Sequence, residues 1–309
     1  MRRPGRPKLA EHAGRFTVAA AGADAAPAIS WLGVSTLLLD DGDTPIMTDG
    51  FFSRPGLTRL ALGKIAPSRP RVQGCLTRAG VQHLAAVLPV HTHYDHALDS
   101  ALVAELTGAP LIGGQSTAFI GRGHGLPEDR IVVVDPGSAV PIGNFEVTLI
   151  ESGHCPPDRF PGPVTAPVRP PARVSAYRCG EAWATLVRHT PTGRRLLIQG
   201  SAGFRPGALA GQRAEVAYLG LGQLGRQPES YLRDYWAETV RTVGAHTVVG
   251  IHWDDFFRPL HLPLRALPYA ADDLNVTLRV LGELADADGV ALRLPTVWRR
   301  EDPWAPAPR

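Results

Sequence analysis

The sequence contains a short cluster of histidines and one aspartate whose side chains match the ligands of a transition metal. His91, His93, Asp95 and His96 fall within the six residues of the segment HTHYDH. Imidazole nitrogens and carboxylate oxygens are ordinary zinc ligands, and a turn at the end of a strand lets residues spaced by one and by two converge on one point. The spacing therefore predicts a metal centre that suits two neighbouring cations.

Two further histidines lie downstream in the same sequence setting. His154 follows the apolar segment FEVTLIES, and His252 follows HTVVGI, so each comes at the exit of a predicted strand. The HTHYDH cluster also follows an apolar run, VQHLAAVLPV, which is typical of a buried strand that delivers polar residues at its end. We therefore expect both histidines to belong to the ligand set.

The order of these residues resembles the signature of the metallo-β-lactamase fold superfamily, in which an HTHYDH-type motif precedes two distant histidines. The resemblance runs from about Ile29 to the region after His252. It implies a four-layer αββα sandwich of mixed α and β structure, with the site along one edge. It further implies that metal one is held by His91, His93 and His154, and metal two by Asp95, His96 and His252.

The same resemblance draws attention to Asp49 and Ser201. Asp49 ends the segment IMTDG, where the superfamily has an aspartate that orients the site from behind the ligands; such a carboxylate fixes a histidine tautomer. A turn aspartate before Gly50 is the alternative. In LLIQGSAGF, Ser201 stands where a metal-bridging aspartate is usual. Because a hydroxyl screens the repulsion of two dications poorly, we expect a weaker second metal.

These ligands predict hydrolysis by a metal-activated water. A bound cation lowers the pKa of water toward about 7 and polarises the oxygen that gains charge, while Asp95 could orient or deprotonate that water. We expect one or two Zn²⁺ ions, with Mn²⁺ or Fe²⁺ as alternatives. The expected substrate is a small molecule with an ester, lactone or phosphodiester bond, since HWDDF resembles a branch of the superfamily with lactonase and phosphodiesterase members.

Two other functions remain open at this point. The absent bridging aspartate would suit a catalytically degraded metal- or ligand-binding protein of the same fold. A nuclease is the other alternative, but the tract between Ser201 and His252 is too short for the clamping domain of many superfamily nucleases, and the net charge of +3 is small. We therefore expect no nucleic-acid partner. His124, in GRGHGLP, is a further candidate for a substrate contact.

Composition and length predict one globular hydrolase domain. Of 309 residues, 44% are hydrophobic and 20% are charged, as in ordinary folded domains. We assign residues 1–28 to a flexible N-terminal tail and residues 29–309 to the domain. Cys75, Cys155 and Cys179 are odd in number and widely spaced, which favours a reducing cytoplasm over a disulfide scaffold. No apolar run approaches the roughly 18 residues that cross a bilayer; the sequence leaves the oligomeric state open.

The elements that must position the ligands are short and alternate between strand and helix. The apolar runs predict a hairpin and several strands, the clearest helical patterns are brief, and such a mixture favours layered α and β structure. The Pro-rich stretch at 155–171 cannot belong to a central strand and predicts a stiff loop of open function. The predicted ranges are a hairpin within 29–50, strands within 81–90, 110–113, 131–135, 145–152, 194–200 and 214–221, and helices at 99–106 and 229–243.

Overall fold

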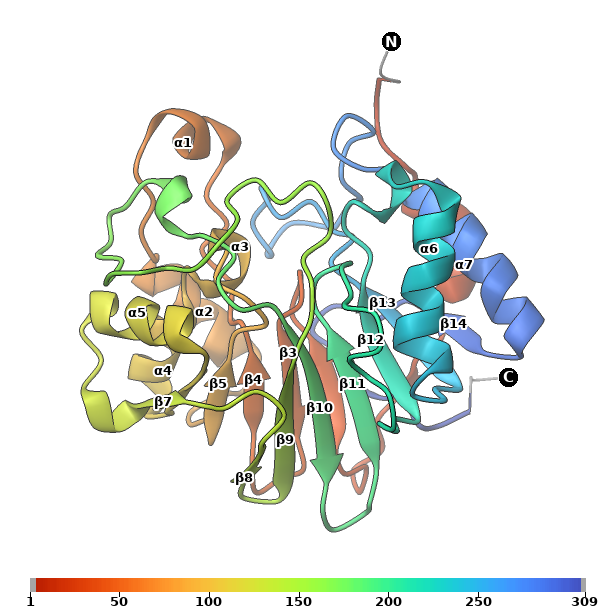
Figure 1. Cartoon of the computed structure of the whole chain (residues 1–309), viewed down its shortest axis with the longest axis horizontal. Coiled ribbons are helices and arrows are strands. Elements are labelled where there is room, and N and C mark those ends of the chain that lie inside the picture. Colours follow the sequence, from red (N-terminus) through yellow and green to blue (C-terminus); the bar gives the residue numbers. More distant parts are fainter. Residues whose placement is uncertain (1–3, 307–309) are drawn as a thin grey trace.

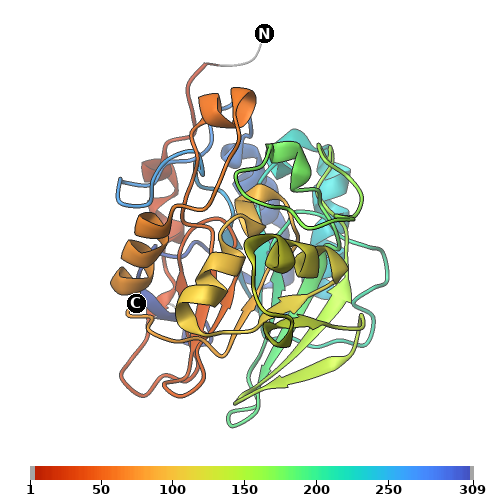
Figure 2. The same cartoon turned by 90° about the vertical axis from the view of Figure 1, so that its left-hand side faces the viewer.

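The computed structural model describes residues 4–306 of the chain. In this part of the chain two β-sheets pack face to face, and helices cover the outer face of each sheet (Figure 1). Figure 2 looks onto the helices that cover the first sheet, with the sheets behind them. The N-terminal and C-terminal halves of the chain contribute one sheet each for the most part. The predicted four-layer αββα sandwich is confirmed.

The first sheet runs in the order β1-β15-β2-β3-β4-β5-β6-β7. Neighbours are antiparallel from β1 to β4 and parallel from β4 to β7. Its strands are β1 (Ala19–Ala20), β2 (Ala28–Trp31), β3 (Leu37–Asp40), β4 (Ile46–Thr48), β5 (Ala86–Leu88), β6 (Leu111–Gly113), β7 (Ile131–Val133) and β15 (Arg300–Asp302).

The second sheet runs in the order β14-β13-β12-β11-β10-β9-β8. Strand β10 is antiparallel to both β9 and β11, and β11 to β14 are parallel, so β9, β11, β12 and β13 all end at one edge. Its strands are β8 (Ala139–Ile142), β9 (Phe145–Glu151), β10 (Trp183–His189), β11 (Arg195–Gln199), β12 (Val216–Gly220), β13 (Thr247–Ile251) and β14 (Ala291–Arg293).

Helices α2, α4 and α5 lie on the outer face of the first sheet, and α6 and α7 lie on the outer face of the second (Figure 1). The α-helices are α1 (Leu57–Leu62), α2 (Arg69–Arg78), α3 (Tyr94–Ala97), α4 (Ser100–Thr107), α5 (Gln115–His124), α6 (Glu229–Trp236) and α7 (Leu274–Asp288). Shorter 3₁₀ turns are η1 (Leu9–Arg15), η2 (Glu128–Arg130), η3 (Val174–Ala176) and η4 (Leu224–Arg226), and η5 (Ala237–Arg241) is a π-helical turn that continues α6.

Alternating side chains of the first sheet fill two separate cores. In β3, Leu37 and Leu39 point to the core between the sheets, whereas Leu38 points to the core beneath α2 and α4. In β5, Leu88 and Val87 divide in the same way. This period of two is what a pleated strand buried on both faces requires, and it holds the strands rigidly at the edge where the polar segments begin.

The segment predicted as a flexible tail carries structure in its described part. Between residues 4 and 28 the chain forms η1, adds β1 to β15, and begins β2. The guanidinium of Arg6 lies 3.1 Å from Asp255, and the carbonyl of Arg15 accepts a hydrogen bond of 2.7 Å from the Leu294 amide. Composition alone missed these contacts because they join residues far apart in sequence. Residues 1–3 of the predicted tail lie outside the described residues.

Candidate metal centre

The HTHYDH segment forms a loop and the first turn of a helix directly after β5. His91 and His93 lie in the loop, and Asp95 and His96 lie in α3, which begins when the Ala97 amide donates to the carbonyl of His93 at 2.8 Å. The change from extended loop to helical turn aims two pairs of side chains in different directions. All four residues therefore reach the same edge of the sandwich.

His154 and His252 come to this edge from the second sheet. His154 follows β9 and His252 follows β13, as their positions after apolar runs predicted. His252 has a φ of 57°, and its amide donates a hydrogen bond of 2.9 Å to the carbonyl of Val34 in the first sheet's half of the chain. The structure thus brings together all of the residues predicted as ligands: His91, His93, Asp95, His96, His154 and His252.

The first candidate ligand set, which we call set one, consists of His91, His93 and His154. Nε2 of His91 lies 3.2 Å from Nδ1 of His93, and the ring centroid of His154 lies 4.6 Å from that of His93. Nδ1 of His154 is 2.7 Å from the carbonyl oxygen of Cys155. Because a carbonyl can only accept, that nitrogen must carry the proton, which leaves Nε2 of His154 as a free lone pair for a cation.

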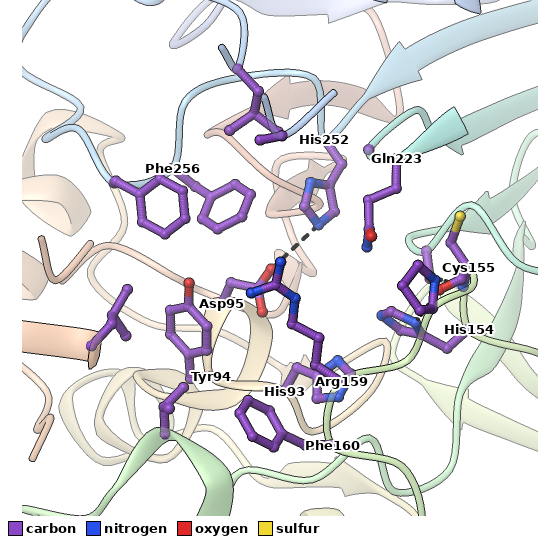
Figure 3. A pocket seen from close by; sticks show the side chains of 18 of the residues that line it. His93, Tyr94, Asp95, His154, Cys155, Arg159, Phe160, Gln223, His252 and Phe256 are labelled. Carbon is purple, nitrogen blue, oxygen red and sulfur yellow. Dashed lines mark hydrogen bonds and ion pairs between the residues drawn. The ribbon is translucent and has the colours of Figure 1, made fainter. Parts of the chain in front are cut away.

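The second ligand set, set two, consists of Asp95, His96 and His252. Nε2 of His252 lies 3.3 Å from Nε2 of His96 and 3.5 Å from Oδ2 of Asp95, the contact drawn in Figure 3. Nε2 of His96 lies 3.7 Å from the same oxygen. Tetrahedral zinc with bonds of about 2.0–2.2 Å separates its ligand atoms by roughly 3.3–3.6 Å, so set two already has the spacing of such a site.

The donor atoms of each set are better satisfied by binding a transition metal than by hydrogen-bonding to one another. Two imidazole nitrogens that face each other at 3.2–3.3 Å, as in both sets, satisfy each other only when one of them carries a proton. A third acceptor atom joins each pair, so each set has more lone pairs than protons to share. Imidazole and carboxylate donors together suit zinc, iron, manganese and similar cations.

Asp49 lies behind set two, fully buried. Its Oδ2 is 2.8 Å from Nδ1 of His96 and accepts a hydrogen bond of 2.7 Å from the hydroxyl of Ser35, while its Oδ1 accepts from the Val90 amide at 2.9 Å. The carboxylate fixes the proton of His96 on Nδ1 and leaves Nε2 facing Asp95 and His252. Sequence reasoning placed Asp49 here through the resemblance; it did not find Ser35, whose position depends on the first hairpin.

Ser201 lies at the end of β11 and lines the same cavity. Its hydroxyl oxygen accepts a hydrogen bond of 3.1 Å from the amide of Cys155, next to the set-one ligand His154. The preceding Gly200 allows a close approach to the segment after β5, because a Cβ there would come within 2.6 Å of the Val90 side chain. Ser201 therefore presents a neutral hydroxyl to the cavity beside set one, and its place at a metal-bridging position stays a prediction.

Burial and mutual repulsion keep the set-one histidines neutral. Burial lowers the pKa of His91 well below its ordinary value and lowers that of His154 to about 4, and neighbouring imidazoles add to both shifts. In set two, burial alone would raise the pKa of Asp95, yet His96 and His252 hold it far below its usual range. At neutral pH set one therefore offers unprotonated imidazoles and set two an ionised carboxylate, the forms that bind metal. Burial would also lower the pKa of His96, but the carboxylates of Asp49 and Asp95 outweigh burial and raise it.

Both ligand sets border a cavity of about 480 Å³. Part of its lining is apolar and includes Phe256, Phe257 and Leu60 of α1. Arg159 and Gln223 extend into the space in front of His93, Asp95 and His252 (Figure 3), and Arg226 also borders the cavity. Such a cavity can enclose a small organic molecule, and its cationic and amide groups can bind that molecule's oxygen atoms.

His124, the predicted substrate contact, lies elsewhere. It ends α5, and its Nε2 is 2.7 Å from a carboxylate oxygen of Glu105, away from the residues that border the cavity. Sequence reasoning also left Asp254 and Asp255 without a role. Asp254 forms a buried ion pair with Arg54, and Asp255 pairs with Arg6 and Arg265. The paired acids of HWDDF therefore brace the loop that follows His252.

No known family model matches the chain. Among its relatives, a "UPF0173 metal-dependent hydrolase" of Pyrobaculum islandicum is 24% identical over 127 residues, which cover 41% of this chain and 50% of the relative. An uncharacterized Mycobacterium tuberculosis protein is 27% identical over 88% of this chain and 72% of its own length. A "probable L-ascorbate-6-phosphate lactonase" of Salmonella paratyphi B is 26% identical over 40% of this chain and 41% of its own. The chain spans about half the length of the first of these relatives.

Solved structures share the fold at low sequence identity. A "possible metal-dependent hydrolase" from Veillonella parvula matches with a TM-score of 0.56 and 14% identity. The match covers 89% of this chain and 99% of the Veillonella chain. CmlA, a diiron β-hydroxylase from Streptomyces venezuelae, matches with a TM-score of 0.56 and 14% identity over 90% of this chain and 54% of its own. The chain thus shares its fold with these metal-dependent enzymes, and that fold is the two-sheet sandwich that the resemblance implied. Within residues 4–306 no helix is both long and apolar enough to cross a membrane.

Proposed function

We propose that this chain, which has the metallo-β-lactamase fold, is a metal-dependent hydrolase of small molecules that holds one or two Zn²⁺ ions. One observation carries the proposal: two adjacent sets of three ligand atoms meet at one edge of the sandwich and open into one cavity. Relatives named metal-dependent hydrolases support it. Iron or manganese would suit the same donors, and a structural neighbour on this fold is named as a diiron protein.

Each of the two ligand sets would hold one ion. His91, His93 and His154 would hold the first, and Asp95, His96 and His252 the second. When bound, such cations supply a water molecule of lowered pKa and a Lewis acid for the oxygen that gains charge. Asp95 has two carboxylate oxygens, so one can remain free to accept a hydrogen bond from that water and orient it. Asp49 keeps the His96 proton on Nδ1 throughout.

The cavity supports an ester, lactone or phosphodiester as the bond that is cleaved. The Arg159 guanidinium and the Gln223 amide, both directed into the cavity, can donate hydrogen bonds to carbonyl or phosphoryl oxygens (Figure 3). The apolar part of the lining, which includes Phe256, Phe257 and Leu60, can exclude water from the reacting bond. The relative named as a lactonase favours testing lactones first.

The experiment is a substrate screen with defined metal loading. Metal-free full-length protein would be reconstituted with Zn²⁺, Mn²⁺ or Fe²⁺ and assayed against lactones, carboxylic esters and phosphodiesters, with His252→Ala as the matched inactive control. Turnover that needs metal and is lost in the variant supports the proposal. Metal binding without turnover on any class would instead favour a degraded metal- or ligand-binding protein, the alternative motivated by Ser201.

The expected surroundings of the enzyme are also part of the proposal. The three cysteines Cys75, Cys155 and Cys179 are all unpaired, which suits a reducing compartment, and we infer a cytoplasmic location. A mixed, weakly basic sequence with a net charge of +3 offers no sign of a nucleic-acid partner. Fractionation of cells that express the native protein would test the location.

A further inference from the structure

We propose that Asp158, carried by the Pro-rich loop at 155–171, is a positioning carboxylate for the set-one ligand His93. This inference rests on the proposed metal-dependent function. This role would give a function to the Pro-rich loop, which the sequence left open. Asp158 would act through His93, by holding the ring and its proton in place, and would touch neither substrate nor metal.

The two nitrogens of His93 face in different directions. Nδ1 lies 3.2 Å from Nε2 of His91, on the side of set one, whereas Nε2 lies 3.2 Å from Oδ1 of Asp158 on the opposite side. Nε2 is buried and has no partner with hydrogen-bond geometry within the described residues, so its 3.2 Å contact with Asp158 is electrostatic. A proton on Nε2 would be attracted to the carboxylate, and Nδ1 would then be left to bind a cation.

Cys179 gives the Asp158 carboxylate a second partner. Cys179 is buried, 5% exposed, and its Sγ lies within 4.8 Å of a carboxylate oxygen of Asp158. Since an ionised carboxylate can only accept, the thiol would be the donor in a hydrogen bond between them. The carboxylate thus lies between an imidazole and a thiol, and its own side chain is 22% exposed.

Backbone hydrogen bonds fix this arrangement relative to the HTHYDH segment. The Asp158 carboxylate also accepts from the amide of Phe160 at 3.1 Å, and the carbonyl of Phe160 accepts from the Cys179 amide at 2.8 Å. The Cys179 carbonyl in turn accepts from the amide of Thr92 at 2.8 Å. Thr92 lies between the ligands His91 and His93, so a continuous chain of contacts runs from the metal-binding loop to Asp158 and back.

The result is a pair of matching supports, one for each ligand set. Asp49 faces Nδ1 of His96 in set two at 2.8 Å, and Asp158 faces Nε2 of His93 in set one at 3.2 Å. A carboxylate in this position raises the basicity of the ligand nitrogen, and its loss typically weakens metal binding about 10–100-fold. Asp158 also adds a negative charge near two cations at a site where Ser201 supplies none.

The same atoms allow a competing explanation, in which His93, Asp158 and Cys179 themselves hold an additional cation. Their ligand atoms lie within 4.8 Å of one another. That cation would need Nε2 of His93 to lose its proton while Nδ1 binds the set-one metal, so that one ring bridges two ions. The positioning role needs only the neutral imidazole, which is why we favour it.

The test compares zinc affinities in the full-length chain by competition with a chromophoric chelator. The variants are Asp158→Asn, Asp158→Glu, Cys179→Ser and, as an exposed control, Asp135→Asn. We expect Asp158→Asn to weaken one equivalent of Zn²⁺ about 10–100-fold and leave the other unchanged, with Asp158→Glu restoring part of the loss. Cys179→Ser keeps a donor and should leave the number of bound ions unchanged, as should the control.

Two results would overturn the inference. One is a folded Asp158→Asn protein in which both zinc affinities equal those of the wild type. The other is the loss of one complete zinc equivalent in Cys179→Ser, which would establish the additional cation. Failure of the proposed function is distinguishable from both: without a metal site the wild-type protein would bind no zinc at all, and without catalysis it would bind zinc but turn over no substrate. Replacing Zn²⁺ by Co²⁺ provides a second readout, since the absorption bands of the set-one ion should change in Asp158→Asn alone.

Discussion

Arg54 and Asp254 form an ion pair of 2.7 Å in which neither side chain is exposed to solvent. Oδ1 of Asp254 also accepts a hydrogen bond of 2.9 Å from the Val34 amide, and the Val34 carbonyl accepts from the amide of the ligand His252. The Arg54 Nη2 and Asp254 Oδ2 atoms lack linear hydrogen-bond geometry, so their contact is chiefly electrostatic. Through it, the loop after β4 is joined to the loop that carries His252.

Removing either member of this pair should destabilise the protein strongly. Asp254→Ala or Arg54→Met leaves one buried charge without its partner, which costs about 3–5 kcal/mol in the free energy of unfolding. Urea unfolding of the metal-free protein measures the loss. The control is Arg265→Met, which removes a partly exposed partner of Asp255 and should cost about 1 kcal/mol or less. Equal losses in Asp254→Ala and the control would show that the buried pair is not structurally important.

Removing one ligand from each set should remove about one metal equivalent each time. His93→Ala affects set one and His252→Ala affects set two. We expect hydrolytic activity to fall at least about 100-fold in both, with the circular dichroism spectrum unchanged, because the ligands lie at the edge of the sandwich. His83→Ala, which alters an exposed histidine outside the site, is the control. Full metal content in either ligand variant would remove that histidine from the site.

Introducing the usual carboxylate at Ser201 should strengthen the second metal. In Ser201→Asp an anion would offset part of the repulsion between two cations about 3.5–4 Å apart. Isothermal titration with Zn²⁺ should show higher affinity for the weaker equivalent, whereas Ser201→Ala should show no gain. Activity can move either way, because a tightly held hydroxide is a poorer nucleophile. An unchanged second affinity in folded Ser201→Asp would mean that this side chain does not face the metals.

A buried carboxyl away from the ligands should impose a pH dependence on stability. Burial raises the pKa of Asp272 from 3.8 to about 7, although the amides of Gln223 and Asp273 donate to its oxygens at 3.0 and 2.9 Å. The folded state therefore holds a proton that the unfolded state releases near pH 4. The stabilisation is fully present below pH 4 and is lost as the pH rises to about 7.

Replacing Asp272 by Asn should remove this dependence. The amide stays neutral and keeps one acceptor oxygen, so Asp272→Asn should gain roughly 2–4 kcal/mol over the wild type between pH 4 and pH 7. Urea unfolding at several pH values measures the gain. Asp135→Asn, an exposed position, should follow the wild-type curve. A constant difference between Asp272→Asn and the wild type at every pH would contradict the assignment.

The clustering of the candidate metal ligands could be predicted because their positions follow from local pattern. Each ligand segment comes directly after an apolar run, and in the structure β5, β9 and β13 end where HTHYDH, His154 and His252 begin. The fold class followed from the resemblance. The role of each ligand remains a prediction until metal binding is measured, although the structure brings the six side chains together.

Other features depend on contacts that the sequence pattern does not encode. Strand β10 was not predicted, because it is buried on nearly every position and shows no alternation. Helix α7 was also missed, although Asp273 accepts a hydrogen bond from the Asn275 amide as an N-cap. Val34 and Arg54 have φ values of 49° and 43°, which no propensity favours for such residues and which the buried Arg54–Asp254 pair maintains. The position of Asp158 beside His93 could not be predicted from sequence pattern either, since it depends on the contact with Cys179.

Each ligand set combines residues that follow strands of both sheets, which links metal binding to folding. His96 and His252 lie 156 positions apart in the chain, so an unfolded molecule presents neither site. A cation that binds only the folded form shifts the folding equilibrium by an amount that grows with its free concentration. The concentration of free metal should therefore affect the lifetime of the protein as well as its activity. In a cell that lacks metal, we expect a larger unfolded fraction and faster degradation by proteases.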